Sequence, residues 1–188
     1  MTLFEYLAVA FSIVLGFSLT HLLGRVRSVF EPGRRHAVHI TFFFFLVLLH
    51  PQLWWALWDL HDEAPWNLFT FFYTLVGPAL LYLIATSVVP IDRSTNLSWE
   101  EHFGSSRPWI YGFTAAYMLW AIGEVYWVFG ISLFHPYRVV QTSLFLIAMA
   151  AAIRPSSRMD RIAVPLMLII FVGAQLVFRI DPGGYFSG

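Results

Sequence analysis

The chain has 188 residues, of which 59% are hydrophobic and 19% aromatic, and only 12% carry a charge. Soluble domains usually carry about 25% charged residues, so most of this surface is expected to face lipid. Eleven arginines, no lysines and eleven acidic residues give no net charge, which excludes the basic footprint of a nucleic-acid partner. The absence of cysteine excludes disulfides, thiol chemistry and thiolate metal sites.

Six segments are long and apolar enough to cross the membrane as helices, because about 30 Å of hydrocarbon requires roughly 20 residues. These segments are residues 3–23, 38–60, 67–89, 109–130, 137–153 and 162–178. The alternation typical of a membrane barrel is absent, so helices are the expected spanning form. We therefore predict an all-α polytopic membrane protein, with residues 1–188 forming one transmembrane domain of six helices in one bundle. The first segment has neither the basic start nor the cleavage site of a signal peptide, and we expect it to remain as a helix.

The arginines predict the orientation of these spans. Most of them follow the first, third and fifth spans, and the positive-inside rule places those segments in the cytoplasm. The residues concerned are Arg25, Arg27, Arg34, Arg35, Arg93, Arg107, Arg154, Arg158 and Arg161. The predicted topology is therefore N-out/C-out, with Arg-rich cytoplasmic loops, in a plasma membrane of the bacterial inner-membrane type.

Two local patterns agree with this topology. Tryptophans gather at the predicted outer ends of the second and third spans, as aromatic anchors do at a membrane interface. They are Trp54, Trp55, Trp58 and Trp66. In the cytoplasmic segment after the third span, Ser98 and Glu101 have the spacing of a capping box, which predicts a short surface helix.

The first span carries small residues at strict four-residue spacing, a pattern that lets helix backbones approach closely. They are Ala8, Ser12, Gly16, Thr20 and Gly24. We expect this face to pack inside the bundle, and a homo-oligomer contact is the alternative. The opposite face is suited to lipid. Its residues are Phe11, Leu15, Leu19 and Leu22.

Helix-breaking residues lie near the middle of two spans. Pro51 in the second span and Gly77-Pro78 in the third each remove a backbone donor, so we expect bends at similar depth near the bilayer midplane. Simple kinks account for such residues, and discontinuous helices at matched depth are also where transporters place binding sites. Both interpretations stay open at this point.

Glu124 is the clearest ionisable residue inside a span, where charged groups are costly. It lies toward the outer side of the fourth span, on one helical stripe with Tyr117, Trp120 and Trp127. Aromatic N–H and O–H groups can donate to its carboxyl group. Two roles are compatible with this pattern: a structural acid bonded across the bundle, and a carboxylate that handles protons or cations.

His50 is the second intramembrane candidate. It lies next to Pro51, with Gln52 nearby, and shares a face with Trp54 and Trp58 at four-residue spacing. A neutral histidine with one interhelical hydrogen bond is the simpler interpretation. A third ionisable residue lies near the inner end of the first span, namely His21. Staggered from outside to inside, the three residues could relay a proton if the helices bring them together.

Several cofactors are excluded or disfavoured by the residues present. A retinal Schiff base needs lysine, which is absent. His21 and His50 differ by about nine residues in depth, or ~13 Å, so they cannot clamp one haem. His36 and His39 form a His-x-x-His pair without a carboxylate motif, and we interpret them as interfacial residues. We predict no catalytic residues, no metal and no bound cofactor.

Two functional hypotheses follow. The first is a small transporter or channel-like protein that moves protons or a small solute through a polar site near the midplane. The second is a non-catalytic accessory subunit of a larger membrane complex, of electron-transport or photosynthetic type, that packs laterally against protein, quinone or pigment. In either case the partners are the lipid bilayer and either further copies of this chain or a larger complex.

Overall fold

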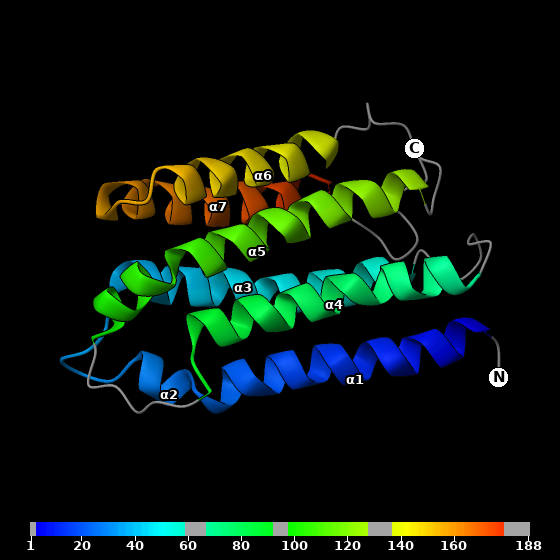
Figure 1. Ribbon diagram of the computed structural model, residues 1–188, viewed down its shortest axis with the longest axis horizontal. Coiled ribbons are helices and arrows are strands. Elements are labelled where there is room, and N and C mark those ends of the chain that lie inside the picture. Colours follow the sequence, from blue (N-terminus) through cyan, green and yellow to red (C-terminus); the bar gives the residue numbers. More distant parts are fainter. Residues whose placement is uncertain (1–2, 59–66, 92–97, 128–136, 179–188) are drawn as a thin grey trace.

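The structure, a computed structural model, describes residues 3–58, 67–91, 98–127 and 137–178. Within these ranges every element is a helix, which confirms the all-α prediction (Figure 1). The helices are α1 (Leu3–Gly24), α2 (Val26–Val29), α3 (Ala37–Leu57), α4 (Leu68–Val88), α5 (Trp99–Trp127), α6 (Tyr137–Ile153) and α7 (Ser157–Phe178). Six of them are long, and each overlaps one of the six predicted spans.

Four helices are both long and apolar enough to cross a membrane, namely α1, α3, α4 and α7. Helix α6 is also apolar but has only 17 residues. Several long apolar helices are expected of a membrane protein. The total of six spans and the N-out/C-out topology stay predictions.

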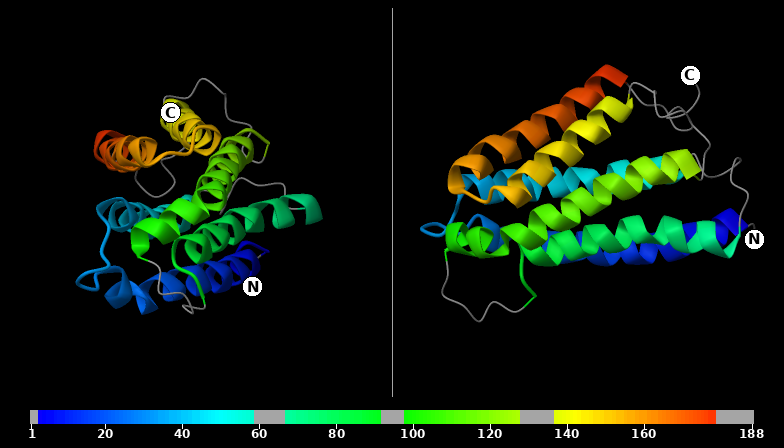
Figure 2. Two further views of the ribbon diagram at one scale, coloured as in Figure 1. Left: turned by 60° about the vertical axis from the view of Figure 1, so that its left-hand side comes forward. Right: turned by 45° about the horizontal axis from the view of Figure 1, so that its top comes forward.

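The six long helices form a closed ring in the order α1, α4, α5, α6, α7, α3, and α3 also contacts α4 and α5. Consecutive long helices run in opposite directions, so α1 begins at the end of the bundle where α7 finishes (Figure 2). We name the two ends by labelled residues. The His39 end is where α3, α5 and α7 begin, and the Trp58 end is where they finish (Figure 1).

Aromatic side chains of α3 fill the centre of the ring. Phe42 and Phe45 are both fully buried. Phe42 meets Phe103 and Tyr111 of α5 edge-on at centroid distances of 5.9 and 6.3 Å, and Phe45 meets Phe171 of α7 at 5.7 Å. Edge-to-face pairs of this kind add favourable contacts beyond simple area burial. The centre of the bundle is therefore occupied by packed rings that join α3, α5 and α7.

The prolines predicted to bend the second and third spans lie inside continuous helices. Helix α3 passes through Pro51 to Leu57, and α4 passes through Pro78 to Val88. Neither proline ends its helix, and a bend at either position stays a prediction. Gly77 has a packing role, because the ring of Trp120 occupies the space where its side chain would lie.

The prediction of which face of α1 packs inside the bundle is wrong. The residues assigned to lipid face the interior: Phe11 is 1% exposed and Leu22 is fully buried. On the small-residue face Ala8 and Ser12 are half-buried, whereas Gly16, Thr20 and Gly24 are exposed. Large side chains fill the space against α4 and α3, and the small residues are left on the outer surface. Ala8 still packs against the core, whereas Gly16, Thr20 and Gly24 do not pack inside the monomer.

The capping box at Ser98 is present, but the helix that it opens is longer than expected. Ser98 N–H donates to the Glu101 carboxylate at 2.9 Å, and Glu101 N–H donates to Ser98 Oγ at 3.3 Å. The Ser98 donors hold the pKa of the Glu101 carboxyl below its usual range. Helix α5 then continues through Pro108 to Trp127. The predicted surface helix and fourth span are thus one element.

Candidate functional site

A buried histidine–serine pair joins α1 to α3. His50 is 1% exposed and Ser18 is fully buried. His50 Nδ1 lies 2.7 Å from the Leu46 carbonyl oxygen, and Nε2 lies 2.7 Å from Ser18 Oγ. Because a carbonyl oxygen only accepts, Nδ1 carries the proton of the neutral ring, and Nε2 accepts from the Ser18 hydroxyl. The tautomer is therefore set by the geometry.

This pair can accommodate two protonation states without moving a helix. A serine hydroxyl can either donate or accept, and its hydrogen rotates freely. When Nε2 of His50 takes up a proton, Ser18 Oγ can rotate its hydrogen away and accept from the imidazolium. The geometry of the two contacts is therefore compatible with both the neutral and the protonated ring. The sequence identified His50 but did not identify Ser18 as its partner.

The aromatic stripe predicted beside His50 faces α1. Trp54 lies 6.3 Å from Phe11, and Trp58 lies 6.4 Å from Phe4, measured between ring centroids. His50, Trp54 and Trp58 thus all contact α1 from the same side of α3. Both tryptophans remain about half exposed, at 45% and 55%. They line a groove of about 360 Å³ between α1 and α3.

The other residues near the predicted midplane site line a separate groove. Pro51, Gln52 and Gln175 border a space of about 440 Å³ between α3 and α7. Pro51 is exposed, whereas His50 beside it on the chain is buried and directed to α1. Pro51 and the imidazole of His50 therefore lie on different sides of α3.

His21 is one helical turn from Ser18 on α1, toward the His39 end. Residues three apart on a helix are neighbours on one face, so the Ser18–His50 pair and His21 follow the same side of α1. His21 is half-buried, and its Nε2 lies 2.6 Å from the Val89 carbonyl oxygen. Two of the three predicted relay residues are thus arranged along one helix face.

Glu124 is separate from these two histidines. It is 9% exposed and lies near Tyr73, with which it interacts electrostatically. Tyr73 and Trp120 are locked together: Trp120 Nε1 donates to the Tyr73 carbonyl at 2.8 Å, and the Tyr73 hydroxyl donates to the Trp120 carbonyl at 3.1 Å. The hydrogen bonds of His50 go to α1 and to its own helix. The structure therefore does not join Glu124 to His50.

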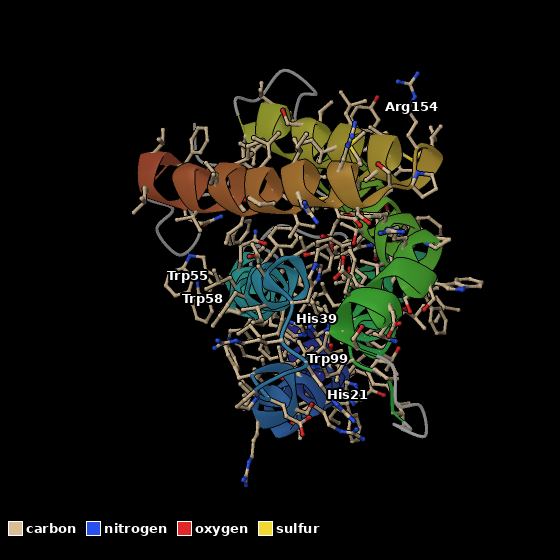
Figure 3. The ribbon with its side chains drawn as sticks, turned by 90° about the vertical axis from the view of Figure 1, so that its left-hand side faces the viewer. His21, His39, Trp55, Trp58, Trp99 and Arg154 are labelled. Atoms are coloured by element: carbon tan, nitrogen blue, oxygen red, sulfur yellow. The ribbon has the colours of Figure 1, made fainter. Side chains whose placement is uncertain are left out.

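A cluster that the sequence did not indicate surrounds the C-terminus of α4. Three histidines from three helices bond to successive α4 carbonyls. His102 Nε2 lies 3.1 Å from Ser87 O, His39 Nε2 lies 2.9 Å from Val88 O, and His21 bonds Val89 O. Figure 3 shows His21 and His39 close together between the helices, beside Trp99. We call this arrangement the α4 cap.

The α4 cap has a direct physical cause. The last carbonyls of a helix have no partner within that helix, and positive or N–H-bearing groups are favourable there. His39 is fully buried and stacks on Trp99 at 4.3 Å, so its interpretation as an interfacial residue is wrong. Each ring nitrogen that faces a carbonyl must donate its N–H, because a carbonyl oxygen only accepts. These nitrogens are therefore occupied by hydrogen bonds to the end of α4. No group of ligating side chains within the described ranges could hold a metal ion.

A buried ion pair at the His39 end was also missed. Arg107 Nε donates to Asp160 Oδ2 at 2.7 Å, and the Tyr111 hydroxyl donates to Asp160 Oδ1 at 2.9 Å. Arg107 further donates to Ser157 Oγ at 3.1 Å. Asp160 is only 2% exposed. This network ties α5 to the first turn of α7.

Comparisons with known proteins give no assignment: no family model, no curated protein and no solved structure matches this chain.

Proposed function

We propose that this protein is a small polytopic transporter or channel-like protein that moves protons, or a small solute coupled to protons, across a bacterial-type inner membrane. The observation that carries the proposal is the buried Ser18–His50 pair. An ionisable ring inside a membrane bundle is costly, and it is expected at ion and proton pathways. Six spans with both termini outside place this pair near the bilayer midplane.

His21 and Glu124 supply further proton-binding groups on either side of this pair. His21 follows Ser18 by one turn toward the predicted cytoplasmic side. Glu124 lies toward the outer side and serves the other half of the path. Their contacts support two separate polar regions, so the proposed transport cycle needs water or a helix movement between Glu124 and His50.

Replacing His50 with glutamine tests the proposal. Glutamine keeps hydrogen-bonding groups but cannot bind a proton near neutral pH, so we expect proton flux into liposomes to fall by at least about tenfold. The flux is measured as the decay of an imposed pH gradient with an entrapped fluorescent indicator. His36→Gln is the matched control, because His36 lies at the start of α3 and forms no side-chain cap bond there.

Glu124→Gln separates the two halves of the path. If flux through this variant equals that of the unmodified protein, the carboxylate takes no part. If His50→Gln also leaves the flux unchanged, while circular dichroism shows an intact helical protein, the transport proposal is wrong.

A second function, that of an accessory subunit, is favoured by a different observation. The small-residue face of α1 points outward, and a side chain built at Gly16 or Gly24 would touch nothing within 4 Å. Small residues at four-residue spacing allow two membrane helices to approach closely. This face therefore suits lateral contact with another membrane protein or a second copy of the chain. Quinone or pigment contact belongs to this alternative.

Cysteine substitution tests this contact cleanly, because the chain contains no cysteine of its own. In membranes under mild oxidation, we expect Gly16→Cys to form an intermolecular disulfide, seen as a band at twice the monomer mass. Ile169→Cys on α7 is the control, since Ile169 is 66% exposed on another side of the bundle. Equal cross-linking of both variants would indicate random collision and would contradict the proposed contact through α1. A heavier band with a different protein would support the accessory role instead.

A further inference from the structure

Arg138, the second residue of α6, has an unusual environment for a guanidinium group. Its side chain is 5% exposed. Nη1 donates to the Ile122 carbonyl at 2.9 Å and to Gln141 Oε1 at 3.0 Å. The atoms Nε and Nη2 are buried and have no hydrogen-bond partner. One edge of the guanidinium is thus held by α5 and α6, and the other edge has no acceptor.

An unpaired edge of this kind is costly because arginine stays charged and each buried donor without an acceptor loses its hydration. Neither of the two acceptors at Nη1 is anionic: one is a backbone carbonyl and the other a neutral amide. No described carboxylate forms an ion pair with Arg138. The positive charge therefore has no counter-charge within the described part of the chain.

The geometry of the open edge identifies the missing group. Nε and Nη2 present two parallel N–H donors, the arrangement that binds two oxygens of a phosphate or carboxylate group. Arg138 also belongs to the first turn of α6, a helix of 17 residues. The first N–H groups of a helix have no acceptor within it, and this end carries partial positive charge. Both features favour an anion near the start of α6.

We propose that Arg138 and the first turn of α6 form an oxyanion-binding site for a phosphate group at the Trp58 end of the bundle. Gln141 can provide a third donor, because its carbonyl oxygen is used by Arg138 and its amide nitrogen keeps two N–H groups. The phosphate comes either from free inorganic phosphate or from a lipid head group at this membrane surface. The site is distinct from Ser18–His50 and depends on neither proposed function.

Thermal unfolding in dodecyl maltoside, followed by tryptophan fluorescence, tests the site with three probes at constant ionic strength. These probes are inorganic phosphate, dioctanoyl phosphatidylglycerol and, as the phosphate-free control, dioctanoylglycerol. We expect a phosphate-bearing probe to raise the Tm by about 3–6 °C at saturation. Dioctanoylglycerol is expected to leave the Tm unchanged.

Two variants connect the response to the guanidinium edge. Arg138→Met removes the charge, and we expect it to lose the response. Arg138→Lys keeps the charge but not the paired donors, so we expect at least about tenfold weaker binding. The lysine variant also decides the question if the methionine variant does not fold. Arg154→Met is the control, because Arg154 is exposed at the opposite end of the bundle.

The outcomes separate the sources of phosphate. A response to inorganic phosphate identifies a soluble ligand, and a response to phosphatidylglycerol alone identifies a lipid head group. The proposal is overturned if neither phosphate probe shifts the Tm, or if Arg138→Lys binds as tightly as the unmodified protein.

Discussion

Replacing Arg107 with methionine is expected to destabilise the folded bundle by about 3 kcal/mol or more. The main cause is the buried Asp160 carboxylate that remains after the substitution. Asp160 is 2% exposed, and its only described partner besides Arg107 is the Tyr111 hydroxyl at 2.9 Å. Removing the guanidinium leaves a buried carboxylate without a counter-charge. Such a loss costs far more than the pair itself contributes, because the desolvation of Asp160 is no longer offset.

Reversible unfolding in mixed detergent micelles, followed by circular dichroism, measures this effect. Arg158→Met is the matched control, since Arg158 is exposed on the first turn of the same helix that carries Asp160. We expect the control to change stability by less than about 0.5 kcal/mol. The double variant Arg107→Met/Asp160→Leu should regain most of the loss, because it removes both charges. A loss in Arg107→Met no larger than in the control would show that Asp160 does not need its ion pair.

The positions of the long helices could be predicted well because hydrophobic length is a local property of the sequence. Residues 137–153 were predicted as a span, and α6 has those bounds; α1, α3 and α4 begin within one residue of the prediction. Helix α5 begins ten residues early, because Ser98 and Glu101 already cap it and Pro108 does not interrupt it. The capping box was recognised, but its consequence for the length of the following helix was not.

The sequence pattern of α1 alone could not show which of its faces points into the bundle. Four-residue spacing of small side chains shows where a second backbone can approach, but it does not say whether that backbone belongs to the same chain. In this bundle Phe11 and Leu22 fill the interior, and Gly16 lies outside. Both faces of α1 are apolar enough to lie against lipid. Apolar content alone therefore does not show which face is buried.

The partners of the polar residues lay beyond the reach of sequence periodicity. Ser18 and His50 are 32 positions apart, and Arg107 and Asp160 are 53 apart. A pattern within one helix identifies which ionisable residue is buried, but only the ring order of helices decides what it meets. His50 was identified for this reason, whereas Ser18 resembles any other small residue of a membrane helix.

Gly77→Ala is expected to destabilise the bundle by about 1–3 kcal/mol, although alanine is ordinarily the better helix former. A methyl group at Gly77 would overlap the ring of Trp120. The ring cannot simply move away, because its Nε1 donates to the Tyr73 carbonyl at 2.8 Å. The tyrosine hydroxyl in turn bonds the Trp120 carbonyl. Relief of the clash therefore requires breaking this reciprocal contact or separating α4 from α5.

Gly112→Ala makes the same chemical change on α5 and should have the opposite sign. Gly112 is exposed, and a methyl group there would touch nothing within 4 Å. Alanine at such a helix position is expected to stabilise by roughly 0.5–1 kcal/mol. Combining Gly77→Ala with Trp120→Leu removes the ring and should recover part of the loss, which a general helix effect at Gly77 would not allow. If Gly77→Ala instead stabilises as Gly112→Ala does, α4 and α5 do not approach through Trp120.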